Sequence, residues 1–202
     1  MERHAGPSAD PGDGAIRRRM AVMSRLSPRR QVSLIQYVLV PHDQELAAAV
    51  PDGRETLFTD NERWSTPGAH PGMAVQYCLD DRDAAFARAR SRAAAAGFAV
   101  DDLAVGPSLL TVDLSDDDAY DLTTPRSLKR AQLPATYPDD ANTPAVRQSC
   151  RAAGDRLISA GEGLICTRPA EPQIRTHHEI LAVLPRVTLA VTARTPWHEW
   201  SV

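Results

Sequence analysis

The sequence has few cysteines and few aromatic residues, with 3 Cys and 5% Phe, Trp and Tyr in 202 residues. Cys78, Cys150 and Cys166 are an odd number without CxxC spacing, which argues against a disulfide framework and against a zinc site. No apolar run approaches the roughly 20 residues that a membrane helix needs, and the apolar residues 20–23 are too few for a signal-peptide core. We therefore expect a cytoplasmic protein without a metal and without a membrane anchor.

The chain also lacks a large excess of either charge, because its formal net charge is −3 and its sequence pI is about 6.1. The whole chain thus has no basic field for nonspecific nucleic-acid binding, and such a role would need a local patch. A P-loop, a GxGxxG motif, an HExxH motif and internal repeats are all missing from the sequence. These absences exclude the common nucleotide-loop and zinc-protease explanations.

The length and the 43% of hydrophobic residues suffice for the core of one domain. Residues 1–30 mix Gly, Pro, Ser, Ala and Arg without a hydrophobic period, so we expect a flexible N-terminal arm followed by a single domain over residues 31–202. The arm's seven arginines could contact an acidic partner or nucleic acid. We favour the simpler interpretation, a solvated charge run.

The hydrophobic pattern of the domain mixes strands and helices. A helix from Thr143, as N-cap before Pro144, to about residue 161 is the best marked, and a Pro-rich connection precedes it over residues 123–142. We expect strands over residues 32–40, 73–79, 109–114, 163–167 and 187–192, and further helices over residues 43–50 and 80–97. Regular βαβ alternation is missing, so the pattern predicts the α+β class.

The most informative stretch is the Arg-Trp-Ser-Thr-Pro-Gly loop of residues 63–68, followed by the strand-like Val-Gln-Tyr of residues 75–77. The guanidinium of Arg63 can bind two oxygens of an anion at once, and the ring of Tyr77 can cover a flat group. The pair suits an anionic, ring-bearing ligand if the two side chains converge on one hollow. Alternatively, Arg63 bonds to loop carbonyls and Tyr77 is an ordinary core aromatic.

Three segments of the chain, in order, resemble the RES domain, a bacterial family related to ADP-ribosyltransferases and found mostly as the toxin half of toxin–antitoxin pairs. The family's first hallmark is a Gly-Arg-Trp-Asn-x-x-Gly loop that leads into a Val-x-Tyr strand. The three segments are residues 62–68 with 75–77, residues 110–114 with 120–122, and residues 153–161 with 163–165. The similarity covers about residues 32–192.

This resemblance implies an ADP-ribosyltransferase-like fold with a split β-sheet core and flanking helices, which grips NAD as its substrate and breaks the nicotinamide–ribose bond. The outcome would be NAD degradation or ADP-ribosyl transfer, with water, phosphate or a protein as the acceptor. Arg63 would hold the NAD diphosphate, and Tyr77 would pack on or orient the nicotinamide ribose. Of the two roles open to Trp64, a packing anchor beneath the loop is favoured over stacking on the ligand. The resemblance also implies an antitoxin protein as partner.

The chain departs from the family in two places. The family has a glutamate about three turns after the strand tyrosine, where this helix carries no glutamate, so Asp83 or Glu162 would have to supply a carboxylate. Asp83 is also a typical helix N-terminal acid. The family's Pro-Ser after the late strand is Cys-Thr-Arg-Pro here, so Thr167 would supply the hydroxyl, and Arg168 would lie near the phosphates or face solvent.

Histidines add two weaker candidates. His70 could move protons in the cleft, although loop histidines are usually exposed bystanders. His177, His178 and Glu179 superficially suggest a metal site, but adjacent side chains diverge and no further ligand has the right spacing. The competing hypothesis is a catalytically degenerate RES-like module that binds a nucleotide or a protein. A third is an unrelated α+β domain.

Overall fold

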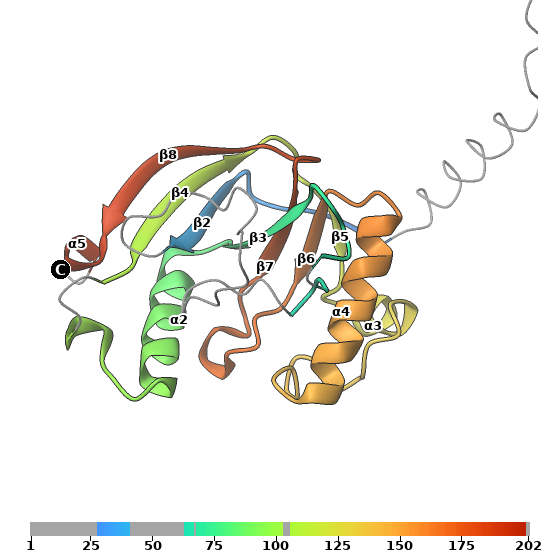
Figure 1. The fold of residues 1–202 in the computed structure, drawn as a ribbon, viewed down its shortest axis with the longest axis horizontal. Coiled ribbons are helices and arrows are strands. Elements are labelled where there is room, and N and C mark those ends of the chain that lie inside the picture. The colour runs from blue at the N-terminus through green and yellow to red at the C-terminus, as the bar shows by residue number, and fades with distance from the viewer. Residues whose placement is uncertain (1–27, 41–62, 67, 103–105, 201–202) are drawn as a thin grey trace, which may run out of the picture.

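A computed structural model describes residues 28–40, 63–66, 68–102 and 106–200 of the chain. These residues form a mixed β-sheet with helices beneath it (Figure 1). The strands are β1 (Arg29–Gln31), β2 (Ile35–Val40), β3 (Ala74–Leu79), β4 (Ser108–Leu114), β5 (Asp118–Asp121), β6 (Leu164–Thr167), β7 (Glu179–Leu184) and β8 (Leu189–Pro196). The helices are α2 (Arg82–Ala95), α3 (Pro125–Arg130), α4 (Pro144–Ser159) and α5 (Trp197–Trp200), with 3-10 turns at Val100–Asp102 and Pro172–Ile174. The fold is α+β, as the sequence predicts.

The eight strands follow the order β1-β5-β6-β7-β3-β2-β4-β8. Only β5 and β6 pair in parallel, and the other neighbours are antiparallel. The central neighbours β2 and β3 share one registered pair, Tyr37 with Leu79. The sheet thus divides into a half of five strands, β1 to β3 in this order, and a half made of β2, β4 and β8. This division fits the split sheet that the resemblance implies.

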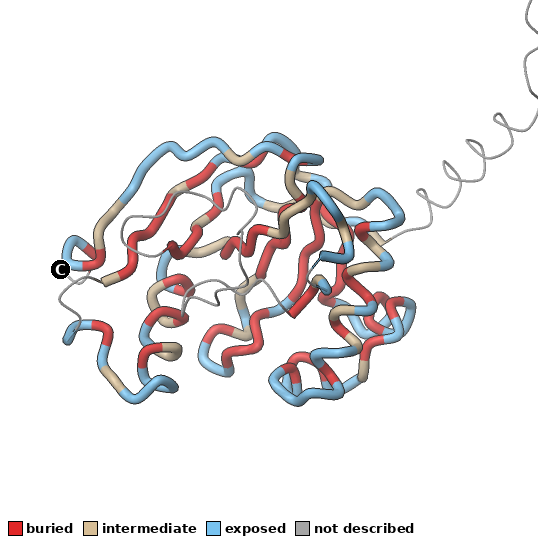
Figure 2. The backbone as a smooth tube through the Cα atoms, viewed as in Figure 1, coloured by how far each residue is buried: buried red, intermediate tan, exposed pale blue. Residues whose placement is uncertain are grey.

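The two long helices cover the same face of the sheet, each under one half, as Figure 1 shows. The inner residues of α4, Val146, Cys150 and Ala153, pack with Ile165 of β6 and Leu181 of β7. The alanines of α2 pack under the other half and against α5. A third cluster is built mostly from strand residues of both halves. Strands β6 and β7 are accordingly almost wholly buried in Figure 2, whereas the edge strand β8 is mostly exposed.

Local sequence explains where the two long helices begin. The side chain of Asp81 accepts a hydrogen bond from the backbone N–H of Ala84 and caps α2. Thr143 caps α4 in the same way, with Pro144 at the first helical position, as the sequence predicts. None of the described helices is long and apolar enough to cross a membrane.

Several elements differ from the sequence-based expectations. The first strand begins at Ile35 rather than residue 32, and residues 29–31 form the separate strand β1 beside β5. The last strand, expected over residues 187–192, runs from Leu189 to Pro196. Residues 1–27 and the helix expected over residues 43–50 lie outside the described residues.

Besides β1, four elements were not predicted: β5, α3, β7 and α5. The connection before α4 contains α3, which begins with a capping box between Thr124 and Ser127. No strand was predicted over residues 179–184 either, yet β7 lies there, between β6 and β3. Its run Ile-Leu-Ala-Val-Leu lacks alternation because both faces of β7 are buried. Such a run is typical of a central strand.

Candidate functional site

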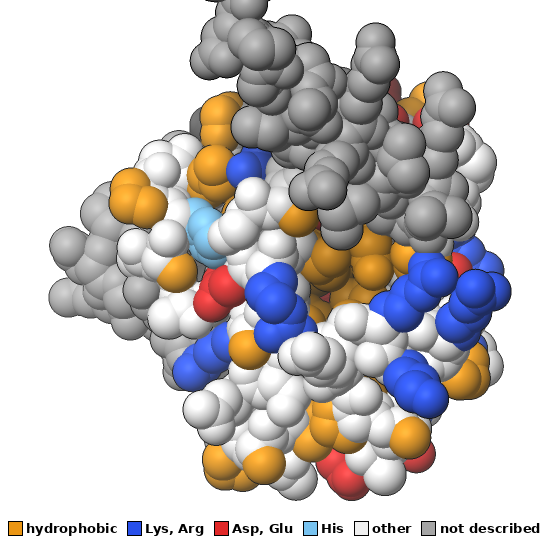
Figure 3. Space-filling view, turned by 90° about the vertical axis from the view of Figure 1, so that its right-hand side faces the viewer, with side chains coloured by type: hydrophobic (Ala, Val, Ile, Leu, Met, Phe, Trp, Pro, Cys, Tyr) orange, Lys and Arg blue, Asp and Glu red, His pale blue; other side chains and the backbone are white. Residues whose placement is uncertain are grey.

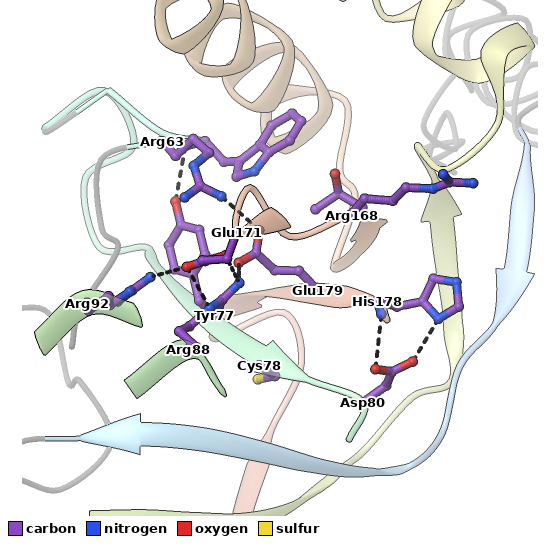
Figure 4. A network of polar contacts seen from close by, with 12 residues as sticks. Arg63, Tyr77, Cys78, Asp80, Arg88, Arg92, Arg168, Glu171, His178 and Glu179 are labelled. Carbon is purple, nitrogen blue, oxygen red and sulfur yellow. Dashed lines mark hydrogen bonds and ion pairs between the residues drawn. The ribbon is translucent and has the colours of Figure 1, made fainter. Parts of the chain in front are cut away.

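A buried ion network lies between α2 and the loop that carries Arg63 (Figure 4). The Nη1 atom of Arg63 lies 3.5 Å from Oε2 of Glu179, the first residue of β7. The Nη2 atom of Arg88, from α2, lies 2.6 Å from Oε1 of the same carboxylate. The Glu179 side chain is 0% exposed, so two guanidinium groups hold a fully enclosed carboxylate. Burying that charge requires such partners.

A second carboxylate, Glu171, extends this network on the α2 side. The Nε atom of Arg88 lies 3.0 Å from Oε1 of Glu171, and Nη2 of Arg92 lies 3.5 Å from the same oxygen. Glu171 lies in the segment after β6, just before the 3-10 turn at Pro172. We call Arg63, Arg88, Arg92, Glu171 and Glu179 the ion network.

The Arg63 loop, residues 63–66 and 68–70 as described, also contacts β3 and α4. The hydroxyl oxygen of Tyr77 accepts a hydrogen bond of 3.0 Å from the backbone N–H of Trp64. A Cβ atom added to Gly154 of α4 would lie 1.8 Å from the carbonyl oxygen of Trp64, so the helix touches the loop backbone directly. The Trp64 indole is fully buried, and its ring meets Tyr137 edge-on at 5.6 Å. Trp64 therefore anchors the loop in the core.

The outer part of the Arg63 loop is tied to α4 by Asp155. This carboxylate accepts hydrogen bonds from the backbone N–H of Thr66 at 3.1 Å and from its hydroxyl at 2.6 Å, and it lies 3.1 Å from Nε2 of His70. Burial raises the pKa of Asp155, but the hydrogen bonds from Thr66 and His70 outweigh it and leave the pKa below its ordinary value of 3.8. His70 thus fastens the loop to α4.

Thr167 and Arg168 are both hydrogen-bonded to Tyr137, whose ring packs against Trp64. The hydroxyl of Tyr137 donates to the carbonyl oxygen of Arg168 at 2.7 Å and lies 2.8 Å from the hydroxyl of Thr167. Since the phenol has one proton, the Thr167 hydroxyl donates to the Tyr137 oxygen. Burial first, and then the negative charge of Glu179, raise the pKa of Tyr137 well above its ordinary value. The Arg168 guanidinium points away from the ion network (Figure 4).

The structure brings some of the sequence-based candidates together and leaves others apart. Tyr77 is hydrogen-bonded to the backbone of Trp64, the residue next to Arg63, and Arg63 and Tyr77 are each only 7% exposed. Asp83 lies exposed in the first turn of α2. It precedes Arg88 by five residues, which places the two side chains about 140° apart around the helix. Glu162 pairs with Arg29 at 2.7 Å.

The two carboxylates of the network, Glu171 and Glu179, were missed as candidates. Sequence reasoning considered Glu179 only as a metal ligand beside His177 and His178. The neighbouring side chains diverge, and Nδ1 of His178 instead lies 2.7 Å from Oδ2 of Asp80. The signal that could have revealed Glu179 is a single acid at the start of the apolar run of β7, because an acid placed there is buried and needs a cation.

Neither thiol chemistry nor a metal cluster is evident in the described ranges. Burial raises the pKa of Cys150 and of Cys166 to about 12, and burial followed by the charge of Glu179 raises that of Cys78 still further. The three thiols are therefore neutral near pH 7 and poor nucleophiles. Within the same ranges, no three His, Cys, Asp or Glu side chains are grouped to hold a metal ion.

Fold and site together define an α+β protein whose split mixed sheet carries an arginine–glutamate network beside two helices. No family model and no curated protein matches the sequence. Among solved structures, the chain is similar to a chain in the crystal structure of the M. tuberculosis MbcT–MbcA toxin–antitoxin complex. The TM-score is 0.60, with 88% of this chain and 90% of that chain covered at 15% sequence identity. At this identity the likeness shows a shared fold.

Proposed function

We propose that the protein is a RES-like, toxin-type enzyme that binds NAD and breaks its nicotinamide–ribose bond. The observation that carries the proposal is the contact between the Arg63 loop and Tyr77, on a fold shared with a chain of a toxin–antitoxin complex. These are the two positions to which the RES resemblance assigns the diphosphate and the ribose. An antitoxin protein is the corresponding partner.

The ion network supports a specific way to bind the dinucleotide. Arg63 holds Glu179 at 3.5 Å, a longer contact than the 2.6 Å between Glu179 and Arg88. A diphosphate would compete with Glu179 for the guanidinium of Arg63, whose planar fork fits two phosphate oxygens. This exchange would leave Glu179 held by Arg88. Glu179 would then replace the helix glutamate that the chain lacks.

The chemistry requires little of the protein beyond charge and position. The bond between C1′ of the ribose and the nicotinamide nitrogen breaks, and both electrons leave with the nicotinamide. The ribosyl cation that develops is stabilised by a nearby carboxylate and shielded by the ring of Tyr77. An acceptor oxygen, from water, phosphate or a protein, then bonds to C1′ and loses its proton.

A catalytically degenerate binding module is the second candidate, and one observation favours it. Residues 86–90 of α2 occupy the region where the family's glutamate is expected, and the buried residues among them are Arg88 and Ala89. Arg88 is engaged with Glu171 and Glu179, so this part of α2 offers no carboxylate to a ribosyl cation. In this case the scaffold would bind a nucleotide or a partner protein without turnover.

Release of nicotinamide from NAD tests the enzyme proposal. We expect release by the native protein and by Arg147→Lys, an exposed arginine of α4, and at least a tenfold loss, about 1.4 kcal/mol, in Arg63→Lys. Lysine keeps a cation beside Glu179 but cannot bind two oxygens in a plane, whereas alanine would leave the buried Glu179 short of a partner.

The same samples separate the two candidates. If the native protein releases no more nicotinamide than Arg63→Lys with water, phosphate and protein acceptors, the enzyme proposal is wrong. A rise of the melting temperature with NAD that Arg63→Lys abolishes would then support the binding module. If NAD raises no melting temperature either, both candidates fail.

A further inference from the structure

The surface beside α3 contains a pocket that the ion network does not use. Its volume is about 680 Å³, within the range of pockets that bind small organic molecules. The apolar part of its lining comes from α3, the turn after it and the end of β5, with Leu122, Pro125, Leu128, Leu133, Ala135 and Tyr137. On this side of the molecule Figure 3 shows a hollow with a hydrophobic floor and Lys and Arg side chains around it. We call it the α3 pocket.

Two cations from separate segments line the α3 pocket. Lys129 comes from α3, and Arg168 comes from the segment after β6. None of the eleven lining residues is acidic. Both cations are exposed, and neither side chain has a hydrogen-bond or ion-pair partner within residues 28–40, 63–66, 68–102 and 106–200. A ligand that fits this lining has an apolar body and a negative charge.

The wall of the α3 pocket at Tyr137 is held in place by contacts of that side chain. The hydroxyl of Tyr137 is bonded to Thr167 and to the Arg168 carbonyl, and its ring lies against Trp64 on the side of the ion network. Gln132, which also lines the pocket, has a φ of 58°, a backbone conformation that few residues other than glycine adopt. A residue held in this way beside a cavity is a common feature of ligand sites.

We propose that the α3 pocket is a second binding site, separate from the Arg63 and Tyr77 site, for a small organic anion with an aromatic or acyl body. The apolar floor takes the body, and Lys129 and Arg168 take the carboxylate, sulfonate or phosphate. Tyr137 forms the wall between this site and the ion network. The site exists whether or not the protein cleaves NAD.

Binding of 8-anilinonaphthalene-1-sulfonate, an aromatic sulfonate whose fluorescence rises in apolar surroundings, tests the proposal. We expect saturable binding of one probe per chain. The double variant Lys129→Gln with Arg168→Gln should bind it about tenfold more weakly. It should still bind the uncharged N-phenyl-1-naphthylamine as the native protein does. Ala135→Trp, which fills the pocket, should weaken both probes.

Arg126→Gln is the matched control, because it removes a positive charge from α3 at an exposed residue that does not line the pocket. Equal weakening by Arg126→Gln and by the double variant would overturn the proposal, as would unchanged binding in the double variant and in Ala135→Trp. Melting temperatures close to the native value verify that each variant is folded.

Competition with NAD tests whether the α3 pocket is separate from the Arg63 and Tyr77 site. We expect 8-anilinonaphthalene-1-sulfonate to bind Arg63→Lys as it binds the native protein, and NAD not to displace it. Displacement by NAD in the native protein but not in Arg63→Lys would show that the pocket is part of the dinucleotide site, and the separate site would be refuted. The titration with 8-anilinonaphthalene-1-sulfonate needs no turnover of NAD. It therefore tests the α3 pocket even if the NAD proposal is wrong.

Discussion

The two ends of the Arg63 loop are held by different kinds of contact, buried at one end and partly exposed at the other. At its inner end, Arg63 and Trp64 are buried and meet Glu179, Tyr77 and the backbone of α4 at Gly154. At its outer end, Thr66 and His70 share the one carboxylate of Asp155, whose side chain is 24% exposed.

The comparison shows how one loop can be rigid where a ligand would meet it and adjustable at its rim. Buried charges cannot lose a partner without leaving another charge unpaired in a medium of low dielectric constant. Partly exposed charges are screened by water and salt, and they contribute little individually. We therefore expect the inner contacts to dominate the free energy of unfolding and the outer contacts to respond to pH.

The largest effect is expected for Glu179→Gln, which leaves Arg63 and Arg88 buried beside a neutral side chain. Breaking a buried ion pair by removing one partner destabilises a protein by about 3–5 kcal/mol. Urea unfolding followed by circular dichroism measures the change. A loss below 1 kcal/mol would mean that the network is open to water, and the inner end would then be no different from the rim.

Gly154→Ala tests the backbone contact of the inner end. In an exposed helix this change adds about 1 kcal/mol of helix stability. Here the new Cβ would lie 1.8 Å from the Trp64 oxygen and 2.8 Å from its carbonyl carbon, and a backbone contact cannot give way as a side chain can. We expect a net loss of about 1–3 kcal/mol by urea unfolding. An increase in stability would mean that α4 does not touch the loop.

Asp155→Asn tests the outer end, with an expected loss of about 1 kcal/mol at neutral pH. Since the folded pKa of Asp155 is lowered, its stabilisation is complete above the ordinary value of 3.8 and is lost as the pH falls through the folded pKa. The melting temperatures of variant and native protein should therefore differ at pH 7 and converge near pH 2. A difference that is constant over this range would contradict the assignment.

The smallest effect is expected for Glu162→Gln, an ion-pair change remote from the loop. The Arg29 side chain of this pair is 30% exposed, so the loss should stay below about 1 kcal/mol and should shrink in 1 M salt. Unfolding at two salt concentrations provides the baseline for Asp155→Asn. A loss as large as that of Glu179→Gln would remove the distinction between buried and exposed pairs.

Sequence reasoning succeeded where local signals are strong. Thr143 and Pro144 predicted the start of α4, and the β-rich run before Asp80 predicted β3 and the place of Tyr77. It failed for β7, because an apolar run without alternation is shared by buried strands and buried helices. It failed for α3 as well, where prolines suggested an irregular connection and the short capped helix was overlooked.

For the candidate site, Arg63 and Tyr77 were predicted to converge on one hollow, and the structure joins the Arg63 loop to Tyr77 by the hydrogen bond from Trp64. The carboxylates that pair with the arginines were not predicted. Asp83 was considered because it lies one helical turn before the expected position, and Glu162 was named as a further acid. The structure supplies Glu171 and Glu179 instead, from segments more than 80 residues after Arg88 along the chain. Pairing between such distant segments leaves no trace in the spacing of residues.

By itself, the sequence determined the α+β class, the caps of α2 and α4 and the apolar strands, because these depend on backbone preferences and on the period of nearby side chains. Only the tertiary structure decided that β7 lies beside β3, that Glu179 faces Arg63 and Arg88, and that Tyr137 divides the ion network from the α3 pocket. Those contacts depend on which strands become neighbours in the sheet. That order is set by the packing of the whole core.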